Sequence, residues 1–162
     1  MAPPISDLFR STPPHSSASP INQVRYLNAQ DLVDLHRAVS LDFGGNQAHP
    51  GEIVNAFGLT NTVQRPQTTI FGKDAYPTLG DKAAAFIFAL LQNMPFHAGN
   101  KRVALTALLA FCELNDRTID ARVLDEKTLE SVLKKAGRTT QQAAPPDSVF
   151  QDLRELMRRA IV

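Results

Sequence analysis

Two almost wholly apolar segments lie in the middle of the chain, and one polar loop separates them. The first covers residues 82–92 and the second covers residues 103–112. Apolar side chains occur on nearly every side of both segments, which predicts two helices buried at the centre of a domain. The proline at position 95 predicts that the first helix ends near Asn93. The second helix is expected to begin near Asn100.

More helices are predicted on both sides of this central pair. Their expected ranges are 30–41, 52–57, 126–135 and 147–160, with Asn28, Asp125 and Asp147 as N-caps of the first, third and fourth. Thr78 is expected to cap the first central helix, with Asp81 at its third position. The glycines of the segment Phe43-Gly44-Gly45 are expected to end the first amphipathic helix.

Residues 60–72 interrupt the helical pattern. They are rich in β-branched residues and lack helical periodicity, which predicts an extended segment and a small two-stranded flap. The expected fold class is therefore all-α, a helical bundle with a small β-flap.

Composition sets the domain organisation. Prolines alternate with serines in residues 1–23, which predicts a disordered tail, so that residues 24–162 form one folded domain. The net charge of +1 is too small to attract nucleic acid or membranes by itself. The basic residues near both C-terminal helices alternate with acidic ones, which predicts solvated faces and no nucleic-acid site. No run is long enough to cross a bilayer and the start is unlike a secretory signal, so the expected location is cytoplasmic.

The polar loop carries the candidate chemistry. Gly99 lets the backbone approach a ligand closely, and the helix that starts at Asn100 points its unpaired N–H groups into the loop. Lys101 and Arg102 place two cations where the helix dipole disfavours them. A bound anion such as phosphate would relieve this conflict. The alternative interpretation is a helical corner whose basic residues are solvated.

This loop resembles the signature of the Fic/Doc (Fido) family, and of its death-on-curing branch. That signature is histidine, proline, phenylalanine, any residue, an acidic residue, glycine or alanine, asparagine, lysine and arginine. The matching residues are Pro95, Phe96, Gly99, Asn100, Lys101 and Arg102. Met94 replaces the histidine and Ala98 replaces the acidic residue. The resemblance covers about residues 24–135.

The resemblance implies a Fido-type helical bundle that binds ATP or another nucleotide and transfers a phosphoryl or AMP group to a protein hydroxyl. It implies that the phosphates bind at Gly99, Asn100, Lys101 and Arg102, and that Phe96 packs the loop inward. A protein target would add a strand beside the flap residues Thr68, Thr69 and Ile70. The toxin-like branch also implies an antitoxin partner.

The two departures affect the reaction more than binding. The thioether of Met94 cannot act as a base, and Ala98 cannot hold a metal, which leaves a role for magnesium in doubt. His97 is a weak substitute, since it should point outward if Phe96 points inward. The chain is therefore predicted to be a degenerate binding module, or pseudoenzyme. The alternative is a transferase of toxin–antitoxin type, either non-canonical or inactivated by substitution at Met94.

Two other side chains are expected to be structural. His36 lies beside the apolar face of its helix and is predicted to be a partly buried structural histidine, not a ligand. Cys112 lies within the second central segment and is predicted to be a core residue without a disulfide partner.

Overall fold

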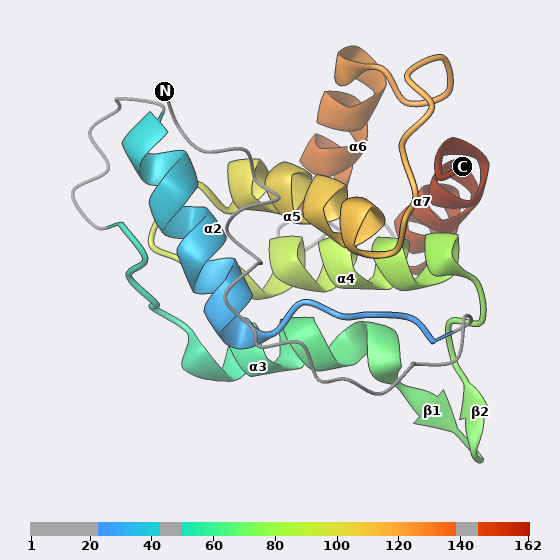
Figure 1. Cartoon of the computed structure of the whole chain (residues 1–162), viewed down its shortest axis with the longest axis horizontal. Coiled ribbons are helices and arrows are strands. Elements are labelled where there is room, and N and C mark those ends of the chain that lie inside the picture. Colours follow the sequence, from blue (N-terminus) through green and yellow to red (C-terminus); the bar gives the residue numbers. More distant parts are fainter. Residues whose placement is uncertain (1–22, 43–49, 139–145) are drawn as a thin grey trace.

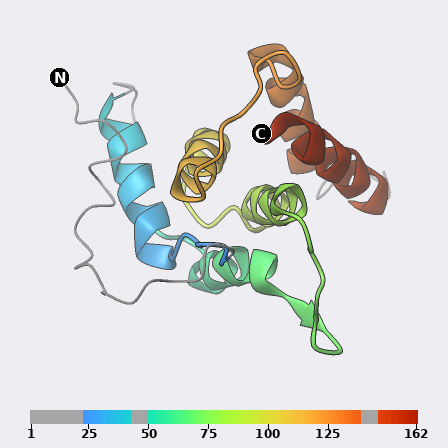
Figure 2. The same cartoon turned by 45° about the vertical axis from the view of Figure 1, so that its right-hand side comes forward.

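A computed structural model describes residues 23–42, 50–138 and 146–162 of the chain. Helix α4 (Leu79–Asn93) lies at its centre, with α3 (Ala56–Gln64), α5 (Asn100–Leu114) and α7 (Pro146–Ala160) packed around it (Figures 1 and 2). Helix α2 (Ala29–Asp42) packs against α5, and α6 (Glu126–Arg138) packs against α4 and α7. The predicted all-α bundle is confirmed. No helix among the described residues has the length and apolar character needed to cross a bilayer.

The central position of α4 follows from its sequence. All residues from Gly80 to Leu91 are buried, and from residue 83 onward this segment is apolar on every side. Its start is fixed by a capping box in which Thr78 and Asp81 bond to each other's backbone N–H groups, as predicted. A Cβ atom on Gly80 would lie 2.7 Å from the Cα of Arg158, so this glycine allows α4 and α7 to approach closely.

Local caps also define α2 and α6 as expected. The N–H group of Asp31 donates to Asn28 Oδ1 at 2.9 Å, and the N–H group of Asn28 donates to Asp31 Oδ2 at 2.8 Å. The N–H group of Thr128 donates to the carboxylate of Asp125 at 2.7 Å. These short-range bonds can be predicted because both partners are close in sequence. The expected N-cap Asp147 instead lies within the first turn of α7.

The prediction for residues 52–67 was wrong. The helix is α3, capped by Asn55, whose side chain accepts from the N–H group of Gly58 at 2.8 Å. Gly58 is buried within this helix and does not end it, and a 3-10 turn, η1 (Arg65–Gln67), follows. Thr62 is fully buried and donates to the Gly58 carbonyl at 2.7 Å. Packing against α4 therefore outweighs the β propensity of this segment.

The predicted flap is present and small. Strands β1 (Thr69–Ile70) and β2 (Lys73–Asp74) pair antiparallel and project away from the helices (Figure 1). Phe71 and Gly72 form the turn with φ values of 51° and 75°, as a two-residue hairpin requires. All four strand residues are exposed.

Several expectations fall outside the described residues. These are the tail up to residue 22, the glycine segment at 43–45 and the linker at 139–145. The cysteine prediction is confirmed, because Cys112 is a free thiol buried in the core.

Candidate phosphate-binding loop

The signature loop connects the two central helices as predicted, since α4 ends at Asn93 and α5 begins at Asn100. Two residues in the left-handed region make the turn, Met94 with φ 43° and Gly99 with φ 77°. A glycine takes this conformation without strain, whereas Met94 adopts it at some energetic cost. The loop therefore has a defined, tightly turned backbone.

The inner side of the loop is held by Phe96 and Asn100. The ring of Phe96 is 1% exposed, as its predicted packing role requires. The side chain of Asn100 accepts from the Phe96 N–H group at 3.1 Å and donates to the Phe96 carbonyl at 2.9 Å. Asn100 was predicted to contact phosphate, and the structure shows that its amide already binds the loop backbone. Its direct contact with a phosphate remains a prediction.

His36 on α2 contacts the loop from the interior of the domain. It is 2% exposed, and its ring stacks on Phe96 with 4.2 Å between ring centroids. Its Nε2 atom lies 2.8 Å from the carbonyl oxygen of Ala98, and its Nδ1 atom accepts from the N–H group of Gly51 at 2.7 Å. His36 is thus more deeply buried than the partial burial predicted for it, and its bonds to the loop were not foreseen.

The segment before α3 holds the start of the loop. The Pro95 carbonyl accepts from the N–H groups of Val54 and Asn55, at 2.8 and 3.2 Å. Ile53 forms an isolated antiparallel bridge with Phe96. The side chain of Asn55 also donates to the carbonyl of Asn93 at 2.9 Å. The loop is thus bonded on one side by α2 and on the other by residues 51–55.

These contacts pair most carbonyl groups of the loop with donors of the protein. The carbonyl oxygens of Pro95, Phe96, Ala98 and Gly99, which would repel an anion, all lie within hydrogen-bonding distance of protein donors. The N-cap of α5 is Gly99, which has no side chain to cap the helix, so the first N–H groups of α5 lie uncapped at the positive end of the dipole. Lys101, whose side chain is exposed, adds a full charge at the same end.

A groove of about 470 Å³ adjoins this end of α5. Residues of α5 line one side of the groove and residues of α6 line the other, and leucines from both helices contribute apolar surface. The α5 residues are Lys101, Arg102 and Leu105, and the α6 residues are Glu126, Leu129, Glu130, Leu133 and Lys134. The Lys134 ammonium, 2.8 Å from Glu130, holds the pKa of that carboxyl below its usual value, and Lys101 acts in the same direction. The groove therefore combines apolar surface with cations next to the loop.

The two loop positions that depart from the resembling signature, Met94 and Ala98, carry neither a basic group nor an oxygen ligand on their side chains. The side chain of Met94 is half exposed and ends in a thioether, which does not take up a proton at neutral pH. Ala98 has only a methyl group, and its carbonyl oxygen faces His36. The residues present therefore do not fit a magnesium ion held by the protein. His97 is exposed, as expected with Phe96 turned inward.

The flap residues Thr68, Thr69 and Ile70 lie in or directly before β1. Thr68 is anchored, since its hydroxyl donates to the Arg65 carbonyl at 2.8 Å. Ile70 is exposed and lies on a strand with only one partner. This geometry leaves strand edges available, while the docking role itself remains a prediction.

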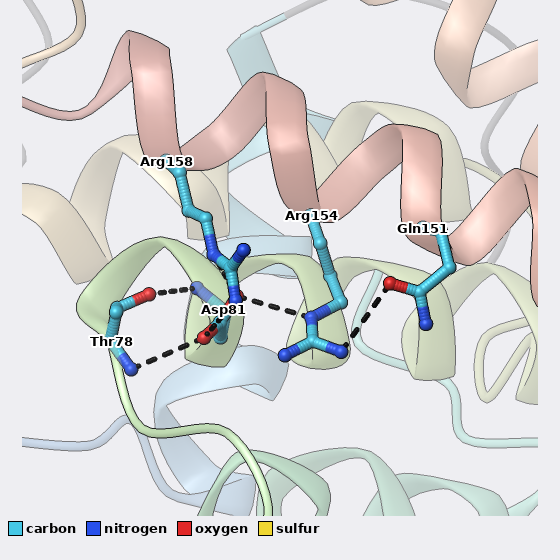
Figure 3. A network of polar contacts seen from close by, with 5 residues as sticks. All are labelled: Thr78, Asp81, Gln151, Arg154 and Arg158. Atoms are coloured by element: carbon cyan, nitrogen blue, oxygen red, sulfur yellow. Dashed lines mark hydrogen bonds and ion pairs between the residues drawn. The ribbon is translucent and has the colours of Figure 1, made fainter.

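A second polar network joins α4 to α7 and was not predicted (Figure 3). Asp81 is fully buried and accepts from Arg158 Nε and Nη2, at 2.6 and 3.0 Å, and from Arg154 Nε at 3.1 Å. Burial alone would raise the pKa of Asp81, but the bonds from Arg158, Arg154 and Thr78 outweigh burial and hold it well below its usual value. The network is structural, since the two arginines hold α7 against α4 and Thr78 caps the start of α4.

Comparison with known proteins matches a segment of the chain that includes the loop. The family model described as Fic/DOC family matches residues 26–112. A Toxin Doc from Mycolicibacterium smegmatis is 41% identical over 91 residues, which cover 56% of this chain and 64% of that relative. The chain thus spans a little under two thirds of the relative's length.

Proposed function

Because the chain belongs to the Fic/DOC family, we propose that it binds a nucleotide through the loop 95–102 without the family's usual catalysis. The protein would then act as a binding module derived from a toxin. The observation that supports this most is the hydrogen bonding of the loop carbonyls to protein donors, which leaves N–H groups and cations on the outer side.

The groove between α5 and α6 extends this proposal from a phosphate to a whole nucleotide. Its volume of about 470 Å³ lies within the range of small-molecule sites, and three leucines give it an apolar wall among charged residues of both signs. The phosphates would lie at Lys101 and Arg102, and the nucleoside would contact Leu105, Leu129 and Leu133. The hydroxyl groups of a ribose could donate to Glu126 at the edge of the groove.

The same loop offers no general base at Met94 and no metal ligand at Ala98. Losing a general base costs about 10²- to 10⁴-fold in rate, and phosphoryl transfer also depends on metal ions to neutralise charge. When magnesium enters with a nucleotide, it would neutralise phosphate charge there, but these two residues contribute nothing to holding it. Binding without efficient transfer is therefore the activity that these residues favour.

Protein partners would bind elsewhere on the domain. The exposed flap is proposed to receive an extended segment of a target protein by strand addition, with Thr69 and Ile70 beside it. The name of the relative, Toxin Doc, supports a second proposal, that an antitoxin binds this chain.

Isothermal titration calorimetry tests the nucleotide proposal. The full chain should bind ATP, with magnesium or with a chelator, and the affinity should fall with added salt. Arg102→Ala should weaken binding about 10- to 100-fold, because a charge-assisted hydrogen bond contributes about 1.5–3 kcal/mol. Arg117→Ala, which removes an exposed arginine from the turn after α5, is the matched control and should bind as the parent chain does. Absence of binding with or without magnesium would refute the proposal.

Radiolabelled nucleotide distinguishes a pseudoenzyme from a transferase. The unchanged chain should label no protein in a cell extract, whereas Met94→His combined with Ala98→Asp should restore labelling. Each single substitution should restore less than the pair, because base and metal ligand act on the same step. Labelling by the unchanged chain would establish the alternative function, a non-canonical transferase.

A further inference from the structure

We propose that His36 is the positioning residue of the phosphate-binding loop. Its imidazole holds the Ala98 carbonyl inward, and so directs the next N–H group, that of Gly99, toward a bound anion. The inference rests on the proposed function, because the anion is the ligand that this orientation would serve.

The neighbours of His36 determine which ring nitrogen donates a hydrogen bond and which accepts one. The N–H group of Gly51 lies 2.7 Å from Nδ1, so Nδ1 must accept a hydrogen bond and carries no proton. The proton of the neutral ring therefore lies on Nε2, which donates to the Ala98 carbonyl oxygen at 2.8 Å. The histidine is thus a donor to the loop and an acceptor from residue 51 at the same time.

Rigid surroundings fix the place of this ring. It is 2% exposed and stacks on Phe96 with an angle of 12° between the ring planes. On the helix side, the hydroxyl of Ser40 donates to the His36 carbonyl at 2.7 Å. A side chain held by α2, Phe96 and Gly51 can define the position of the Ala98 carbonyl closely.

Peptide geometry transmits this position to the outer side of the loop. The Ala98 carbonyl and the Gly99 N–H group belong to one planar trans peptide unit and point in opposite directions. When His36 draws the carbonyl inward, the N–H group must face away from the protein interior. This N–H group directly precedes α5, where the helix dipole and Lys101 are also positive.

Two substitutions separate the two bonds of the ring. His36→Gln can place an amide N–H group near Nε2 and keep the donor to Ala98. His36→Asn is shorter, so it can keep only the acceptor for Gly51. We expect Gln to retain ATP affinity within about threefold and Asn to lose about tenfold, the worth of one net hydrogen bond. Leu32→Val, one turn earlier on α2 with a side chain that cannot bond to the loop, controls for lost stability.

The Gly99 amide resonance in a ¹H–¹⁵N spectrum of the ligand-free chain gives a second readout, which does not require binding. His36→Asn should shift this resonance, because the Ala98–Gly99 peptide unit would lose the bond that orients it, whereas His36→Gln and Leu32→Val should leave it near its parent position. If the parent chain binds no ATP, the nucleotide proposal fails, but the resonance still tests the role of His36. Equal behaviour of Gln and Asn in this spectrum would overturn the inference.

Discussion

Replacing Asp81 with asparagine should weaken the packing of α7 against α4 and so lower the free energy of unfolding. The substitution keeps the size of the side chain but removes the charge that Arg154 and Arg158 share (Figure 3). The asparagine oxygen can still accept from Thr78, so the helix cap is largely retained. The variant therefore isolates the contribution of the buried ion pairs.

The expected loss of unfolding free energy is about 3 kcal/mol. Breaking a buried ion pair by removing one partner costs about 3–5 kcal/mol. The lower end applies because the Asp81 side chain is 0% exposed but that of Arg158 is 48% exposed, so water can solvate its guanidinium after the change. Arg154, at 19%, recovers less solvation.

Urea unfolding followed by circular dichroism measures this loss. Asp147→Asn, an acidic residue exposed in the first turn of α7, makes the same change in net charge and should cost about 0.3–1 kcal/mol. Because the folded pKa of Asp81 is depressed, its contribution is full above the ordinary value of 3.8 and is lost as pH falls below it. The difference in unfolding free energy between the parent chain and Asp81→Asn should thus be constant from pH 5 to 8 and should shrink below pH 4. A loss no larger than that of Asp147→Asn would refute the reasoning.

Three further outcomes are expected. Gly80→Ala should destabilise the fold by about 1–3 kcal/mol, because the new methyl group meets the backbone of α7, whereas Ser131→Ala at an exposed helical site should change stability by under about 0.5 kcal/mol in the same urea assay. Burial raises the pKa of the Cys112 thiol from 9.0 to about 11, so this thiol should react with a disulfide reagent about 100-fold more slowly in the native chain than in urea. Equal rates would contradict its burial. Asn100→Ala should lower the melting temperature and weaken ATP binding, since it removes both bonds to the Phe96 backbone; an unchanged melting temperature would contradict the role assigned to these bonds.

The fold could be predicted where the signals are local. The caps at Asn28, Thr78 and Asp125 bond to residues three positions away, and the apolar runs of α4 and α5 identify buried helices directly. The prediction of extended structure failed for residues 60–67, because the threonines of this segment have strand propensity in isolation. Thr62 is helical since α4 covers it, and no local pattern reports that contact.

The supports of the loop could not be predicted for a similar reason. His36 is 62 residues from its partner Ala98, and Arg158 is 77 residues from Asp81. No helical or strand periodicity in the sequence links residues that are so far apart. The signature residues around Phe96 were visible in the sequence, whereas the groups that orient them were visible only after folding.

The loop is built almost entirely from backbone bonds and from side chains other than those of Met94 and Ala98. Met94 contributes a turn with a half-exposed side chain, and Ala98 contributes a carbonyl. Substitutions of these two side chains are therefore expected to leave the folded loop in place. The shape of the loop and the chemistry that its two departing positions present to a ligand can thus be altered separately by protein engineering.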